Sequence, residues 1–126
     1  MTAQATPPMK PEIKARWVEA LRSGRYVQGR SELRGPTNRL CCLGVLCDIA
    51  VKNGVFPKPE RSATTCRYRY GAAGKGGDLP DEVMAWSGLD RGNPEIRSGT
   101  TQLSLAGLND NGSTFATIAT IIEGQL

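Results

Sequence analysis

Three of the four cysteines lie within seven residues, in the stretch CCLGVLCD at positions 41–48, and an acidic residue directly follows the third. Together with Cys66 they could form a four-thiolate zinc site, or one of them could act as a nucleophile. Structural zinc sites prefer short Cys-x-x-Cys pairs, which this chain lacks, and adjacent residues such as Cys41 and Cys42 at a strand end point to opposite faces. The neighbouring leucines raise the pKa of a thiol. We therefore favour buried, unreactive thiols.

The chain contains no histidine. This excludes Cys-His and Ser-His dyads, the usual general base near neutral pH, and every zinc site that needs imidazole. Asp48 and Asp110 could still serve hydrolysis or bind a divalent cation. We favour a simpler interpretation, in which Asp48 faces solvent and residues 109–112 form a turn whose side chains cap the following helix. The composition favours a non-catalytic protein without a cofactor or metal.

Arginine and tyrosine provide the most useful positive pattern. Several lie in residues 25–39, and residues 67–70 alternate Arg-Tyr-Arg-Tyr, which in a strand places the arginines on one face and the tyrosines on the other. Such a surface can stack a base and clamp phosphates. The alternative is an ordinary solvated face of a half-buried sheet. The candidate ligand-binding residues are Arg25, Tyr26, Arg30, Arg34, Arg39, Arg67, Tyr68, Arg69, Tyr70, Lys75, Asn109 and Asp110.

The glycine-rich stretch GAAGKGG at positions 71–77 differs from a phosphate-binding P-loop. A P-loop has four residues between its first glycine and Gly-Lys, followed by Ser or Thr, whereas here there are two residues and then Gly76. Two interpretations stay open: a mobile lid that covers a ligand, or a slack connection between elements.

The elements that must position these residues follow from periodicity and cap signals. Helices are expected to start near residues 11, 42 and 80, with a fourth from about residue 113 capped by Ser113 or Thr114. Residues 25–39 are typical of a hairpin, residues 64–70 of a strand, and residues 89–112 of a turn-rich stretch with only short strands. We expect an α+β fold: about four helices packed on a small, mostly antiparallel sheet, with a flexible leader at 1–9 and a single compact domain at 10–126.

The charges are unevenly distributed around a net charge of +4. Residues 10–39 contain eight basic and three acidic side chains, and residues 71–126 contain three and seven. This pattern suggests an anionic partner, or head-to-tail contact in a homo-oligomer. No stretch is typical of a signal peptide or a membrane span, so we expect a protein in a reducing cytoplasm without a membrane partner.

Four blocks of sequence carry a resemblance to known proteins: WVEALRSGRYVQGRSELR, CCLGVLCDIA, LPDEVMAWSGL and LAGLNDNGSTFATIATIIE. Together they resemble a group of small uncharacterised bacteriophage and prophage proteins, with a Cys-Cys-Leu-Gly-Val-Leu block and a terminal Leu-Asn-Asp-x-Gly-x-Ser/Thr-Phe helix. They also resemble a domain of unknown function found in actinobacteria and their phages. The resemblance covers most of the chain except the leader and residues 55–78. It implies a phage or prophage origin, a compact fold and the cytoplasm of an infected bacterium, and it brings no catalytic residues.

These observations predict a non-catalytic phage accessory protein that sequesters a small anionic, nucleotide-derived ligand, by analogy to counter host defence signalling. The main alternative is an inhibitor that masks a host protein. A nucleic-acid-binding protein and a histidine-free hydrolase are less favoured. General DNA binding needs many clustered phosphate contacts, which the acidic C-terminal half disfavours.

Overall fold

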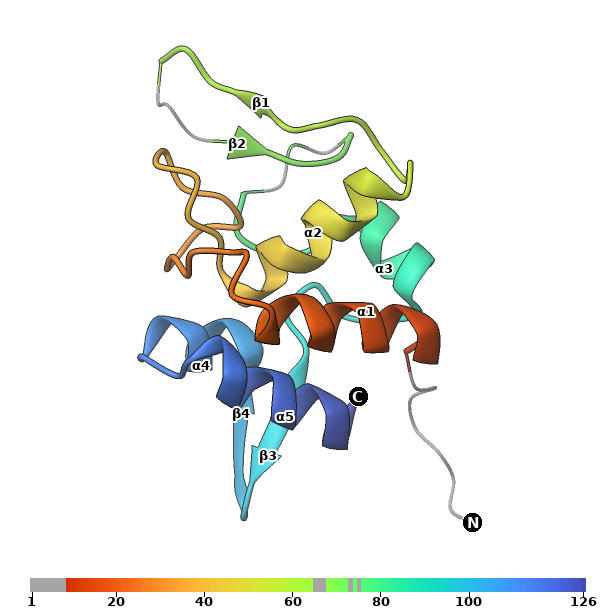
Figure 1. Ribbon diagram of the computed structural model, residues 1–126, viewed down its shortest axis with the longest axis vertical. Helices are drawn as coiled ribbons and strands as arrows, with labels where there is room; N and C mark the ends of the chain where they lie inside the picture. The colour runs from red at the N-terminus through yellow and green to blue at the C-terminus, as the bar shows by residue number, and fades with distance from the viewer. Residues whose placement is uncertain (1–8, 65–67, 73, 75) are drawn as a thin grey trace.

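The computed structural model describes residues 9–64, 68–72, 74 and 76–126. Over these residues the chain forms five helices and two separate antiparallel sheets of two strands each (Figure 1). The helices are α1 (Pro11–Arg22), α2 (Cys42–Lys52), α3 (Asp81–Ser87), α4 (Leu105–Asp110) and α5 (Phe115–Gln125). The strands are β1 (Glu60–Arg61), β2 (Tyr68–Arg69), β3 (Glu95–Ser98) and β4 (Thr101–Ser104). The predicted α+β class is confirmed.

The first and last helices form where their caps and apolar stripes predict them. Proline is tolerated in the first turn of α1, whose residues Ile13, Trp17 and Leu21 are buried. The Thr114 hydroxyl caps α5 by accepting a hydrogen bond from the Thr117 N–H. The two helices lie side by side (Figure 1) and bury their stripes against each other.

Helix α2 lies at the centre of the fold, between α1, α3 and α4 (Figure 1). Most of its residues are buried, from Cys42 through Ala50 with only Asp48 partly exposed. The indole Nε1 of Trp17 donates a hydrogen bond of 2.9 Å to the backbone oxygen of Cys42. This bond ties α1 to the first turn of α2 and satisfies the buried indole N–H of Trp17.

The regular hairpin predicted at residues 25–39 does not form, although the predicted turn does: the Gly35 N–H donates to the Arg39 oxygen at 2.8 Å. Within the described part of the chain this segment makes only isolated bridges, from Gln28 and from Arg34 to Leu40. Ser31 and Asn38 adopt positive φ values of 69° and 64°, which turn the chain and interrupt a regular ladder. The segment is instead an irregular loop held against α2 and α4.

Residues 89–112 contain the two short strands that the sequence predicts, β3 and β4, and also helix α4, which it does not predict. The α4 sequence LAGLND is short, and half of its residues, Gly107, Asn109 and Asp110, have low helix propensity. The Ser104 hydroxyl caps the helix by accepting a hydrogen bond from the Gly107 N–H. The buried residues Leu105 and Asn109 stabilise it further through tertiary contacts.

Met9 belongs to the packed domain, whereas from the sequence alone we assign it to the flexible leader. Met9 is buried in the core, and the N–H of the next residue, Lys10, donates to the Ser87 oxygen at 2.8 Å. Among the described residues, no helix combines the length and the apolar composition needed to cross a membrane.

Candidate functional site

The thiols of Cys41, Cys42 and Cys47 are free and buried, which confirms the predicted environment of these three residues. Burial raises the pKa of Cys41 to about 11 and the pKa values of Cys42 and Cys47 well above their ordinary value. Cys66 lies outside the described residues. Over the part of the chain that the structure describes, no group of three or more Cys, Asp or Glu side chains is arranged to hold a metal ion.

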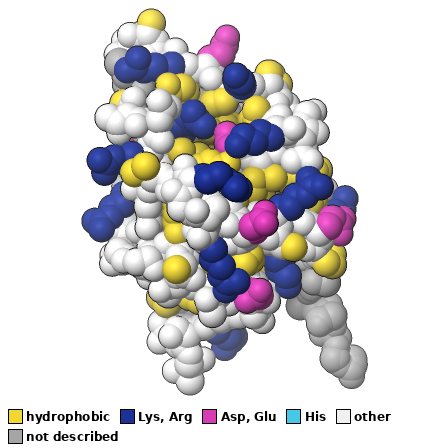
Figure 2. Space-filling model, in the orientation of Figure 1, with side chains coloured by type: hydrophobic (Ala, Val, Ile, Leu, Met, Phe, Trp, Pro, Cys, Tyr) yellow, Lys and Arg dark blue, Asp and Glu magenta, His cyan; other side chains and the backbone are white. Residues whose placement is uncertain are grey.

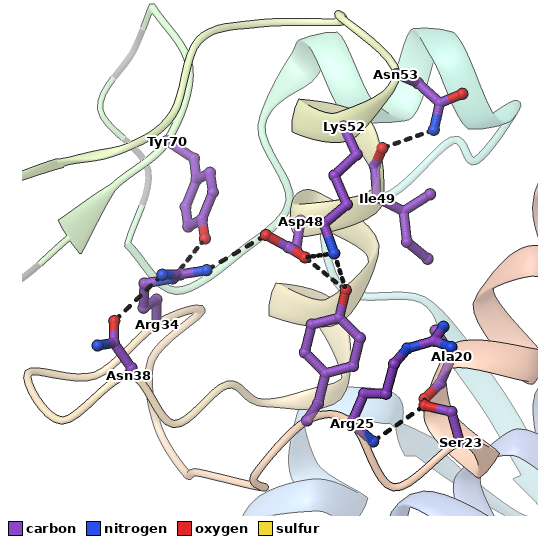
Figure 3. A network of polar contacts seen from close by, with 11 residues as sticks. Ala20, Ser23, Arg25, Arg34, Asn38, Asp48, Ile49, Lys52, Asn53 and Tyr70 are labelled. Atoms are coloured by element: carbon purple, nitrogen blue, oxygen red, sulfur yellow. Dashed lines mark hydrogen bonds and ion pairs between the residues drawn. The ribbon is translucent and has the colours of Figure 1, made fainter.

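Asp48 is the centre of a polar network, so the prediction that it faces solvent is wrong (Figure 3). Its carboxylate accepts a hydrogen bond of 2.5 Å from the Tyr26 hydroxyl and lies 3.3 Å from Arg34 Nη2 and 3.2 Å from Lys52 Nζ. The Asp48 side chain is only 15% exposed. Burial and the bond to Asp48 raise the pKa of Tyr26, and the same carboxylate raises the pKa of Lys52.

Arg34 extends this network to the β1–β2 hairpin. Its guanidinium donates to the Tyr70 hydroxyl at 3.1 Å and to Asn38 Oδ1 at 3.2 Å, and it lies 5.4 Å from the centre of the Tyr68 ring. Tyr70 is fully buried, lies 6.0 Å from the Phe56 ring between centroids, and has a pKa raised by burial to about 12. Arg34 and Tyr70 therefore hold the hairpin to the core and are engaged with protein partners.

Asn109 and Asp110 also make contacts within the protein. The Asn109 amide is fully buried; it accepts from the Cys42 N–H and the Gln28 side chain and donates to the Gly29 oxygen. Asp110 accepts a hydrogen bond of 2.8 Å from the Ser31 N–H. These side chains end α4 and hold the 28–31 loop, rather than capping α5 as we expect from sequence.

The remaining predicted site residues do not form one cluster. Arg25, Arg30 and Arg39 are exposed on the irregular loop, whereas Arg67 and Lys75 lie outside the described residues. Figure 2 shows basic side chains spread over the whole face drawn, without gathering into a single patch. Of the predicted set, Tyr68 and Arg69 border two cavities of the described part of the chain.

The larger of these cavities, which we call the hairpin pocket, has a volume of about 680 Å³. It lies between the chain from Phe56 to Ser62, the turn after β2 and the first turn of α3. Its lining includes three cationic residues, Lys58, Arg61 and Arg69, and two acidic ones, Glu60 and Glu82. Cations surrounding a concave site with apolar walls are suited to binding a small anion.

Glu82 is engaged with the pocket wall. One of its carboxylate oxygens accepts a hydrogen bond of 2.8 Å from the Ala72 N–H, which lowers the pKa of Glu82. Arg69 Nη1 donates to the Gly74 oxygen at 3.2 Å, and the Leu33 N–H donates to the Gly76 oxygen at 2.8 Å. The described residues of the glycine-rich stretch are therefore anchored at three points. We interpret the stretch as part of the cavity wall rather than as a slack connection between elements.

A second, smaller cavity of about 250 Å³, which we call the glycine pocket, is also lined by Arg69. Ser31, Glu32, Tyr68, Gly76 and Gly77 complete its lining. Sequence reasoning finds Tyr68 and Arg69 and misses Phe56, Lys58, Arg61 and Glu82. The only local signal for Lys58 and Arg61 is the basic, proline-interrupted run FPKPER, which has no periodicity.

The fold and the site define a small α+β protein with a cation-lined pocket beneath a β-hairpin. The chain belongs to the family described as Domain of unknown function (DUF8296), whose model matches residues 9–126. No curated protein and no solved structure matches it.

Proposed function

We propose that this protein is a non-catalytic accessory protein of phage type that binds a small anionic, nucleotide-derived ligand in the hairpin pocket. The observation that supports this proposal is that three cationic residues, Lys58, Arg61 and Arg69, line one cavity of about 680 Å³. A guanidinium can donate paired hydrogen bonds to a phosphate, and the lysine ammonium adds a mobile positive charge. The cavity volume lies within the range of small-molecule sites.

The acidic side chains of the pocket narrow the range of ligands. Glu60 and Glu82 leave the five charged lining residues with one net positive charge, since three cations face two carboxylates. A pocket of this composition suits a ligand that combines phosphate with hydrogen-bond donors, as nucleotides do, better than a bare polyanion. The net charge of +4 also favours encounter with anions.

The biological role follows from what such binding would achieve. A small protein that holds a nucleotide signal without converting it lowers the free concentration of that signal. In the cytoplasm of an infected bacterium, sequestration of this kind would counter a defence response that depends on the signal.

A ligand-dependent thermal unfolding experiment tests the proposal. Wild-type protein is heated with a panel of nucleotides, and a ligand present at a hundred times its Kd should add about 2.7 kcal/mol to the free energy of unfolding. Arg61→Ala and Arg69→Ala should each reduce this effect. Arg97→Ala is the matched control, because it removes the same charge from an exposed position on β3, far from the hairpin (Figure 1). The proposal would be contradicted if no nucleotide stabilised the wild-type protein. It would also be contradicted if all three variants lost the same share of the ligand-induced stabilisation.

A further inference from the structure

Arg69 lines two cavities that differ in volume and in charged residues. It lines both the hairpin pocket and the glycine pocket, so a ligand that reaches past Arg69 would occupy both. We propose that the glycine pocket is the subsite for the base of a nucleotide whose phosphates lie in the hairpin pocket. This inference rests on the proposed function and adds the ligand class and its orientation.

Tyr68 lines the glycine pocket, and its aromatic ring is held by a neighbouring cation. The Arg34 guanidinium lies 5.4 Å from its ring centre, within the range of a cation–π contact. Arg34 is itself held by the Asp48 carboxylate at 3.3 Å, the Tyr70 hydroxyl at 3.1 Å and Asn38 Oδ1 at 3.2 Å. Tyr68 is therefore ordered before a ligand arrives, which reduces the entropy lost when a base stacks on it.

The wall formed by Gly76 and Gly77 leaves room for a flat group. A Cβ atom at Gly77 would have no atom within 4 Å, and one at Gly76 would lie 3.8 Å from the Tyr68 backbone oxygen. The Leu33 N–H bonds the Gly76 oxygen at 2.8 Å and holds this wall in place. Two residues without side chains beside a tyrosine create a slot that a planar ring can enter closely.

The charged residues around each cavity indicate the orientation of the ligand. Among its described lining residues, the glycine pocket has one cation, Arg69, and one acidic residue, Glu32, so its charge favours phosphate less than that of the hairpin pocket. Lys58 and Arg61 line only the hairpin pocket. The base should therefore face Tyr68, and the phosphates should face Lys58 and Arg61.

Calorimetric titration with three probes, ATP, GTP and inorganic tripolyphosphate, tests the subsite. Tyr68→Ala should weaken binding of the tighter nucleotide by about tenfold or more, since one stacked base contributes about that much. Its affinity for tripolyphosphate should stay unchanged. Tyr68→Phe keeps the ring and should retain nucleotide binding, whereas Arg61→Ala should weaken all probes that bind.

Gly77→Val provides a second test that leaves the Tyr68–Arg34 contact intact. Because the side chain of residue 77 would extend into open space, the variant should fold normally and partly fill the glycine pocket. It should weaken nucleotide binding and leave tripolyphosphate binding unchanged. If wild-type protein binds nucleotides and neither Tyr68→Ala nor Gly77→Val alters their affinity, the subsite is refuted while the proposed function stands. If wild-type protein binds none of the three probes, both proposals are overturned.

Discussion

The side-chain oxygen of Asn109 accepts a hydrogen bond of 3.1 Å from the backbone N–H of Cys42, a residue 67 positions earlier in the chain. Cys42 is the first residue of α2, where backbone N–H groups have no partner within the helix. The same amide also bonds Gln28 and Gly29, at 2.8 and 2.7 Å. One fully buried side chain thus joins α4, the N-terminus of α2 and the irregular loop.

Asn109→Ala should lower the free energy of unfolding by about 3 kcal/mol, because it leaves several buried polar groups without partners. Urea denaturation measures the change. Asn111→Ala is the matched control: this exposed asparagine makes a single local bond to the Gly107 oxygen, and its loss should cost less than about 1 kcal/mol. Equal effects of the two substitutions would show that the Asn109 contacts do not stabilise the fold.

Gly44 should tolerate no side chain, because α2 packs directly on the backbone at Leu33. A Cβ atom at position 44 would lie 1.8 Å from the Leu33 carbonyl oxygen. Gly44→Ala should therefore lower the free energy of unfolding by about 2 kcal/mol or more, since one backbone must move away from the other. Gly124→Ala, in α5, meets no atom within 4 Å and should raise stability by about 0.5 kcal/mol. Thermal unfolding of both variants measures these changes. An unchanged stability of Gly44→Ala would show that α2 does not pack directly on the Leu33 backbone.

Alkaline pH should destabilise the protein. The pKa of Cys41 rises from 9.0 to about 11 in the folded state, and that of Tyr70 rises from 10.0 to about 12, in both cases mainly through burial. Both groups are neutral in the fold, so their contribution is complete below about pH 9 and is lost as the pH rises through the folded pKa values. The free energy of unfolding should fall steadily between about pH 9 and pH 12.

Urea titrations at a series of pH values check this dependence. Tyr70→Phe removes one ionisable group, together with its bond to Arg34, and should reduce the slope between pH 10 and 12. A free energy of unfolding that stays constant from pH 8 to pH 11 in the wild-type protein would argue against burial of these groups.

Much of the helical structure could be predicted from sequence. Pro11 and Thr114 mark where α1 and α5 begin, and residues such as Trp17 and Ile118 recur at helical spacing. The buried cysteines of α2 follow from their apolar neighbours in the same way. These features depend on residues within a few positions of one another, so local pattern is enough to reveal them.

The cavities and the polar networks could not be predicted in this way. Arg34, Asp48 and Tyr70 look like surface residues in the sequence, yet they meet because an irregular loop crosses α2 beneath the hairpin. Lys58 and Arg61 line the same cavity as Arg69 only once β1 pairs with β2. Periodicity records which side of an element is buried, and it contains no information about which distant segment covers that side.

The sequence by itself therefore determined the α+β class, the position of four helices and the burial of the thiols near α2. Tertiary structure decided that Asp48 is a partly buried hub, that Asn109 is a structural clamp, and that Arg69 and Tyr68 rather than the arginines of residues 25–39 border the cavities. The physical reason is that these roles arise from long-range contacts, whose partners are set by the packing of the whole chain.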